Sequence, residues 1–141
     1  MSEPRSQQLV VFSLAGEEYA LPIGSVHEII RYTEPRTVAS DAAWIRGVIG
    51  LRGKIVAIFD LAARMRLATV GTEPRKIVIV EGGGGQLGVM VDEVEDVLTV
   101  SSEQLEAAPA SPAIEAIAKI GDRLVVVLDP EGLFARAATA A

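Results

Sequence analysis

Ile45-Arg-Gly-Val-Ile-Gly-Leu-Arg-Gly53 is followed directly by Lys54-Ile-Val-Ala-Ile-Phe59. Within this stretch Gly47–Leu51 and Lys54–Phe59 are rich in aliphatic and β-branched side chains, which are typical of short strands. Arg52-Gly53 separates the two segments, and a glycine at such a place is typical of a tight turn. We therefore expect an antiparallel hairpin here. A short helix should follow the hairpin, because Asp60 is a favourable N-cap for the helix-forming residues that come after it.

The same hairpin recurs in the second half of the chain. Ile114–Ile120 and Arg123–Leu128 are again strand-like, and Gly121-Asp122 provides the turn between them. Asp129 then precedes a second short helix, with proline at the favoured first helical position. The hairpin and its helix are therefore expected twice.

The distance between matching residues stays nearly constant along the chain. Asp96 follows Glu28 by 68 positions, and Asp129 follows Asp60 by 69 positions. One inserted residue accounts for the difference. A nearly constant shift of this kind indicates an internal duplication.

The remaining strand-like segments complete two sets of five. They are Leu9–Leu14, Glu18–Ile23, Val26–Tyr32, Lys76–Glu81, Gln86–Val91 and Val94–Val100. We expect a mostly β fold of two tandem five-stranded barrels with short helices. The first barrel should span approximately residues 15–68, with some strands or helices exchanged, and the second approximately residues 76–130.

Composition excludes several classes of function. The chain has 141 residues, no cysteine and a formal net charge of −6. The lack of cysteine excludes disulfides and thiolate metal sites, and the acidic charge argues against a nucleic-acid partner. The first residues are polar, which predicts no secretory signal, and no apolar run is long enough for a membrane helix. We therefore expect a cytoplasmic protein without direct membrane insertion.

Four stretches of the sequence resemble motifs of the CheW family of chemotaxis coupling proteins. In chain order they are Tyr19–Ile30, Ile45–Gly53, Ile55–Leu61 and Leu87–Val97. They occur in the family's order and at its spacing, and they indicate a single CheW-like domain over residues 8–137. Two residues depart from the pattern, since Gly50 stands where the family usually has asparagine and Ala57 where it usually has proline.

The resemblance implies a fold and a function. The fold is two five-stranded SH3-like barrels, and the function is that of an adaptor with no enzymatic activity and no cofactor. The implied partners are the cytoplasmic tips of chemoreceptors and the regulatory domain of a CheA-type histidine kinase, with other copies of the chain as a further candidate. The protein would then be recruited from the cytoplasm to membrane-associated receptor arrays.

Two alternative functions stay open at this point. The first is a CheW-like coupling protein of a type IV pilus or another non-flagellar chemosensory array, which the residues do not distinguish from a chemotaxis adaptor. The second belongs to a different class, a small-ligand-binding β-barrel. It would need polar groups that converge on a cleft, whereas the repeats supply mostly aliphatic residues and glycine.

Glu28 and Arg52 are the charged residues that match partner-contacting positions of the family. Each lies in an apolar strand context. One interpretation is that both face the receptor or the kinase. The other is that they pair with each other across neighbouring strands and only orient the first barrel. The two interpretations are compatible.

Val26 and Gly47 also match positions that the family uses near its contact surfaces. Val26 could line a receptor groove, although a valine in a strand is more often part of a core. Gly47 could allow close approach of a kinase barrel, or it could mark a strand bulge or a tight bend. No residues are proposed as catalytic, cofactor-binding or metal-binding.

Asp92, Glu93, Glu95 and Asp96 form an acidic cluster, and carboxylates are the ligands that a hard cation prefers. Alternate residues of a strand face opposite sides, so the four carboxylates should not converge. We expect a solvated strand edge that discourages aggregation.

Overall fold

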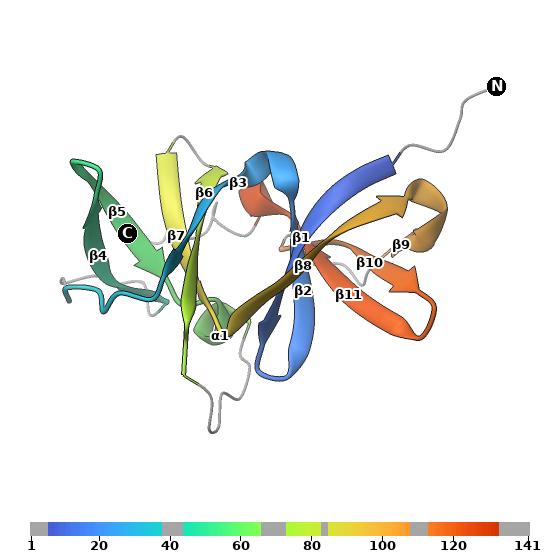
Figure 1. The fold of residues 1–141 in the computed structure, drawn as a ribbon, viewed down its shortest axis with the longest axis horizontal. Coiled ribbons are helices and arrows are strands. Elements are labelled where there is room, and N and C mark those ends of the chain that lie inside the picture. Colours follow the sequence, from blue (N-terminus) through green and yellow to red (C-terminus); the bar gives the residue numbers. More distant parts are fainter. Residues whose placement is uncertain (1–5, 38–43, 66–72, 83–84, 108–112, 133–141) are drawn as a thin grey trace.

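Two β-sheets lie side by side along the long axis of the molecule (Figure 1). The computed structural model describes residues 6–37, 44–65, 73–82, 85–107 and 113–132. The six-stranded sheet consists of β1 (Ser6–Leu14), β2 (Glu17–Pro22), β8 (Glu93–Ser101), β9 (Leu105–Ala107), β10 (Ile114–Ile120) and β11 (Arg123–Leu128). The five-stranded sheet consists of β3 (Val26–Arg31), β4 (Ile45–Leu51), β5 (Lys54–Phe59), β6 (Lys76–Gly82) and β7 (Gly85–Val91).

Each sheet forms a small barrel, so the mostly β fold of two SH3-like barrels is confirmed. The strand order is β8-β1-β2-β11-β10-β9 in one sheet and β3-β6-β7-β5-β4 in the other. The six-stranded barrel has one strand more than expected. This strand, β9, has three residues and follows a 3-10 turn, so it leaves no clear alternation in the sequence.

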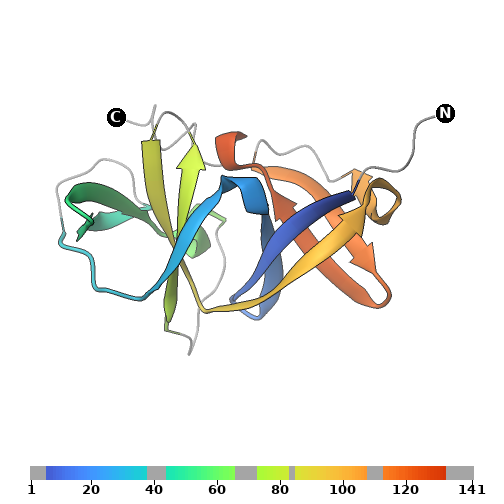
Figure 2. The same cartoon turned by 45° about the horizontal axis from the view of Figure 1, so that its top comes forward.

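Both barrels take strands from both halves of the chain. β1 and β2 pair with β8 and β11, while β6 and β7 pair with β3 and β5. In both views the blue strands of the N-terminal segment therefore lie beside gold and orange strands (Figures 1 and 2). Residues 6–22 join the six-stranded sheet and residues 76–91 join the five-stranded one, so each barrel combines strands from within its approximate span of 15–68 or 76–130 with an exchanged hairpin.

The exchange is reciprocal, and the strand registers repeat along with the sequence. Val10 lies opposite Val97 in the pair β1–β8, and Val78 lies opposite Ile29 in the pair β6–β3. These two pairs are related by the same shift of 68 residues. Both strand pairs also contain a register shift at matching places. The duplication inferred from the sequence therefore describes a structural duplication, in which each half lends its first hairpin to the other half.

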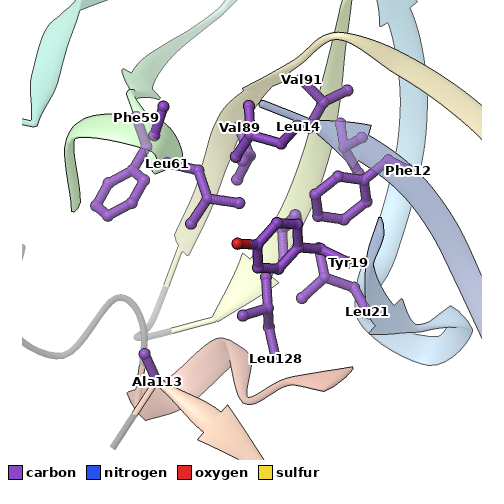
Figure 3. Packing of buried hydrophobic residues seen from close by; sticks show 13 residues of the cluster. Phe12, Leu14, Tyr19, Leu21, Phe59, Leu61, Val89, Val91, Ala113 and Leu128 are labelled. Atoms are coloured by element: carbon purple, nitrogen blue, oxygen red, sulfur yellow. The ribbon is translucent and has the colours of Figure 1, made fainter. Parts of the chain in front are cut away.

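Three apolar clusters form the core, and one of them joins the two barrels. One cluster lies between the barrels and takes buried residues from both sheets (Figure 3). The rings of Phe12 and Tyr19 from the six-stranded sheet stack there with centroids 6.3 Å apart, and Phe59 and Leu61 enter from the other side. The two remaining clusters fill the barrel interiors. Because the shared cluster belongs to neither barrel alone, we expect the two barrels to unfold together.

The helices are short. α1 covers Leu61–Arg64, and the Asp60 carboxylate accepts a hydrogen bond from the Ala63 amide, as expected for an N-cap. Asp129 occupies the matching place and accepts from the Glu131 amide. The remainders of both expected helices, beyond residues 65 and 132, lie outside the described residues. Two 3-10 turns, η1 (Ile23–Ser25) and η2 (Ser102–Gln104), complete the described elements.

Candidate functional site

The mouth of the five-stranded barrel carries a charged pair. Glu28 lies on β3 two residues before Ile30, whose side chain packs into the barrel interior. Residues two apart on a strand face the same side, so Glu28 continues the inward-facing row at the point where the barrel opens. Arg52 is placed beside it by the turn between β4 and β5.

Both ends of the Arg52 guanidinium engage the Glu28 carboxylate. Nε donates to Oε1 at 3.0 Å, and Nη2 donates to Oε2 at 2.9 Å. The Glu28 side chain is only 20% exposed, whereas that of Arg52 is 73% exposed. The planar fork of arginine matches a carboxylate in two parallel hydrogen bonds, which fixes the orientation of both side chains. The pair therefore presents a rigid cationic group to solvent at the barrel mouth.

The turn holds Arg52 in an uncommon backbone conformation. Its φ is +50°, and that of Gly53 is +79°. Two successive positive φ angles are typical of a type I′ hairpin turn, which twists in the same sense as the strands it joins. Residues other than glycine, asparagine and aspartate seldom occupy the left-handed region. The bidentate bond to Glu28 helps to hold the arginine there.

The ion pair changes the acidity of both groups. Hydrogen bonds from Arg52 are the main cause that lowers the pKa of the Glu28 carboxyl from its ordinary value of 4.5. The same hydrogen bonds raise the pKa of Arg52. Since the folded-state pKa of Glu28 lies below the unfolded one, the pair's stabilisation is complete above pH 4.5 and is lost as the pH falls through the folded pKa.

We predict that Arg52→Ala raises the pKa of Glu28 toward 4.5. An NMR titration that follows the side-chain carboxyl carbon of Glu28 measures this change directly. Arg46→Ala provides a control, because Arg46 lies on the same hairpin but faces Asp60, with Nε 3.7 Å from Oδ2. A Glu28 pKa that is the same in wild type and Arg52→Ala contradicts the prediction.

Val26 and Gly47 both pack against other parts of the same chain. Val26 is half-buried and packs against the cluster between the barrels. Gly47 is buried in β4 at a register shift, with a φ of +155°. A Cβ on Gly47 would overlap the carbonyl oxygen of Arg36 and lie 2.7 Å from its carbonyl carbon. The close approach that Gly47 allows is thus that of residues 35–36 of the same chain.

The six-stranded barrel has a second charged cluster at the matching place. Arg123, the first residue of β11, donates from Nε and Nη2 to the two carboxylate oxygens of Glu18, each at 2.7 Å. Its Nη2 and Nη1 also donate to Asp96, at 3.0 and 3.3 Å. These hydrogen bonds raise the pKa of Arg123, and those to Glu18 lower the pKa of that carboxyl.

Sequence reasoning missed this cluster, although the repeat contains a signal for it. Asp96 is the residue that matches Glu28, so a cation near it could have been sought. The cation is Arg123, which matches Lys54 in the first half. The residue that matches Arg52 is Gly121, so aligning the two repeats does not place an arginine opposite Arg52.

The acidic residues lie on or next to β8, an edge strand of the six-stranded sheet, and Glu95 and Asp96 are exposed as expected. Two of the carboxylates are also hydrogen-bonded, since Asp96 accepts from Arg123 and Asp92 accepts from the Ala15 amide at 2.9 Å.

Arg123→Ala should lower the free energy of unfolding by about 1 to 2 kcal/mol, because it leaves the half-buried Glu18 carboxylate and the exposed Asp96 carboxylate without their shared cation. Urea denaturation measures the difference. Lys119→Ala is the matched control, since Lys119 pairs with Glu106 on the same barrel with both side chains more than half exposed. Such a surface pair should contribute no more than about 1 kcal/mol. Equal effects of the two substitutions would refute the prediction.

Within the described part of the chain, no group of three or more histidine, cysteine, aspartate or glutamate residues is placed to hold a metal ion. None of the described helices has the length and hydrophobicity needed to span a bilayer. The described buried side chains are all those of hydrophobic residues. The chemistry available at the two barrel mouths is therefore that of charged, hydrogen-bonded surface groups.

Comparison with known proteins identifies related chains. Residues 8–138 match the family described as CheW-like domain. The chemotaxis protein CheW of Klebsiella aerogenes is 33% identical over 138 residues, which cover 93% of this chain and 83% of the relative. The chemotaxis protein CheW of Bacillus subtilis is 32% identical over 130 residues, which cover 87% and 83%.

A solved structure and a pilus-associated relative complete the comparison. The crystal structure of the scaffolding protein TtCheW from Thermoanaerobacter tengcongensis has a TM-score of 0.84 and 33% identity, covering 94% of this chain and 93% of that chain. Protein PilI of Pseudomonas aeruginosa is 32% identical, but only 59% of this chain and 47% of PilI are covered. The similarity to CheW proteins is therefore the more extensive of the two. This chain belongs to the family of proteins with a CheW-like domain.

Proposed function

We propose that this chain links the cytoplasmic tips of chemoreceptors to the regulatory domain of a CheA-type histidine kinase, and that the barrel mouth with Glu28 and Arg52 is one of its docking surfaces. The general function, a coupling and scaffold adaptor in chemotaxis, follows from the family and from the similarity to a solved scaffolding protein. Coupling of chemoreceptors and CheA is the general role of this family. The particular partners and the docking residues of this chain are the proposal.

One observation carries the proposal for the site. A guanidinium that is 73% exposed is held in a single orientation by a carboxylate that is only 20% exposed. Surface arginines are usually flexible, and ordering a free one on binding costs side-chain entropy. Here the ordering is already provided by Glu28, so a partner carboxylate or carbonyl can use the remaining guanidinium donors at a lower entropic cost.

The same features favour an adaptor without enzymatic activity. Aliphatic side chains fill both barrel interiors, and the described buried residues supply no charged group that could act as an acid, a base or a nucleophile. A small-ligand site would likewise need polar groups that converge on a pocket. An adaptor needs only shaped and charged surfaces. We further propose that the protein is cytoplasmic and reaches membrane-associated arrays through the receptor tips.

Arg52→Ala should weaken binding to the kinase regulatory domain, the receptor tip or both, by about tenfold or more, which corresponds to the loss of a charge-assisted hydrogen bond. Isothermal titration calorimetry with each purified partner fragment measures the affinities. Arg52→Lys tests the fork geometry, because lysine keeps the charge but cannot make the bidentate bond. Lys119→Ala controls for loss of an exposed cation elsewhere. Unchanged affinity of Arg52→Ala for both partners would exclude this docking site.

A further inference from the structure

The N-terminal hairpin, formed by β1 and β2 (residues 6–22), is held in its sheet by long-range contacts. β1 pairs with β8 over most of its length, and β2 pairs with β11. The next strand along the chain, β3, belongs to the other sheet. Within the described residues, the 3-10 turn η1 (Ile23–Ser25) is therefore the only covalent link between this hairpin and the rest of the protein (Figures 1 and 2).

The N-terminal hairpin is bound firmly to the face on which it lies. Phe12 and Leu21 are fully buried there, and Tyr19 is 5% exposed. The Glu18 carboxylate accepts two hydrogen bonds from Arg123 on β11, each at 2.7 Å. A hairpin that left this face would expose its apolar side chains to water and lose the free energy of their burial. A released hairpin is therefore driven back to such a face, either in its own chain or in a second copy.

The link itself is held by few interactions. The Val26 amide donates to the Ile23 carbonyl oxygen, and the Ser25 hydroxyl donates to the Pro22 carbonyl oxygen at 2.8 Å. No residue of η1 is buried, and none belongs to the three apolar clusters. Pro22 is already extended, with φ −56° and ψ 135°. Straightening η1 therefore breaks two local hydrogen bonds and leaves the core residues in place.

The two halves of the chain already exchange hairpins with each other. β6 and β7 come from the second half and complete the five-stranded barrel, and β6 pairs with β3 in the register that β1 has with β8. The β6–β7 hairpin is connected to the described protein at both ends, since α1 precedes it and β8 follows it. Its release would have to move two connections. Among the described residues, release of the N-terminal hairpin moves η1 alone.

We propose that a second copy of this chain is a partner through exchange of the N-terminal hairpin, so that residues 6–22 of each copy complete the six-stranded barrel of the other. The exchange re-forms every contact of the hairpin with β8 and β11. Its cost is confined to η1 and to the entropy of association. Three extended residues span about 10 Å, so the two copies would meet close to their η1 segments. Because each unit keeps both barrels whole, the dimer carries the Glu28–Arg52 pair twice.

The length of η1 should decide between monomer and dimer. When Gly24 and Ser25 are deleted, the one remaining residue of η1 cannot form the turn, so the hairpin should reach its face only in a second copy. Sedimentation velocity should then show twice the 14.9 kDa of a single chain. Insertion of Gly-Ser-Gly-Ser after Gly24 is the matched control, and this chain should stay monomeric because a longer link lets the hairpin fold back. A shortened chain that is folded and monomeric overturns the inference.

Cysteines report the exchange directly, because the chain has none of its own. Gln8 on β1 and Thr99 on β8 are exposed and lie opposite each other. Opposite residues of antiparallel strands have Cα atoms about 4.5 to 5.5 Å apart, which a disulfide can bridge. Gln8→Cys and Thr99→Cys are made in separate chains with the natural η1, mixed in urea, refolded together and oxidised with glutathione disulfide. Mass spectrometry should find the link between positions 8 and 99, in a yield that rises with protein concentration during refolding.

Glu95→Cys is the matched control for Thr99→Cys. Glu95 is exposed on the same strand but four residues away, about 13 Å, which is too far from position 8 in the monomer and in the exchanged dimer. Equal yields with Glu95→Cys and Thr99→Cys would show random collision and overturn the inference. Absence of the link at every protein concentration would overturn it too. This measurement uses the natural η1, so it decides the matter even where the shortened chain does not fold.

A shortened chain that carries both Gln8→Cys and Thr99→Cys shows how its dimer is built. In an exchanged dimer the disulfide joins two chains, and the dimer should survive denaturation until a reductant is added. A dimer whose disulfides all form within single chains would use another surface. That result would also overturn the inference.

Discussion

Phe59→Ala should lower the free energy of unfolding by about 3 to 5 kcal/mol, the range expected when a large core side chain is truncated to alanine. Phe59 is fully buried, and it belongs to the cluster between the barrels rather than to the interior of either one (Figure 3). The cavity left by the ring would be lined by residues from both sheets. The strands of each barrel pair in a fixed register with strands from the other half of the chain. Neither barrel can therefore shift by itself to fill the cavity.

Calorimetry or thermal circular dichroism should show the effect as a melting temperature lowered by roughly 10 to 17 °C, in a single transition. The single transition is part of the prediction, since the shared cluster couples the barrels. Ile55→Ala serves as control, because Ile55 is on the same strand but 79% exposed, and its truncation should change stability by less than about 0.5 kcal/mol. Two separated transitions, with only one shifted by Phe59→Ala, would show that the barrels fold independently.

Gly47→Val should destabilise the protein by more than about 2 kcal/mol, and expression of folded protein at 37 °C should fall accordingly. Two causes act together. The φ of +155° disfavours any residue with a Cβ, and the added atoms would collide with the backbone of Arg36. A collision with backbone cannot be relieved by a rotamer change. The segment at residues 35–36 would have to move away from β4, which would break the hydrogen bonds between Arg36 and Val48.

The control for Gly47→Val is Gly50→Ala on the same strand. A Cβ added to Gly50 would meet no other atom within 4 Å, so alanine should be accommodated with a change in stability below about 0.5 kcal/mol. Equilibrium denaturation of the two variants compares them directly. If Gly47→Val were as stable as Gly50→Ala, the close approach of residues 35–36 would not be the reason for a glycine at position 47.

Local sequence features predicted the individual elements well. The β4–β5 and β10–β11 hairpins were predicted with the bounds of the second strands correct to the residue, because their apolar runs are interrupted by short turns with glycine. The N-cap of α1 was predicted from Asp60 alone. These features depend on neighbouring residues, and short-range interactions decide them. The three-residue strand β9 was missed because its formation depends on pairing with β10.

The candidate site was predicted in part. Both charged residues of the pair were identified, and the interpretation in which Glu28 and Arg52 contact each other agrees with their two hydrogen bonds. The placement of Val26 against the shared cluster and of Gly47 against residues 35–36 depends on which segments meet across the fold. The Arg123 cluster joins β2, β8 and β11, which are far apart in sequence. No local pattern reports such a meeting.

The main strands and the duplication could be inferred without coordinates, because hydrophobic alternation, turn residues and a constant repeat distance are properties of the linear chain. The family could be inferred from the four motifs that resemble it. Which hairpin joins which barrel became known from the strand pairing in the folded protein. Both halves have the same strand pattern, so a hairpin could pair within its own half or with the other half at similar local cost. The shared apolar cluster and the hydrogen bonds between Arg123 and Glu18 join residues from both halves of the chain, and these long-range contacts favour the exchanged arrangement.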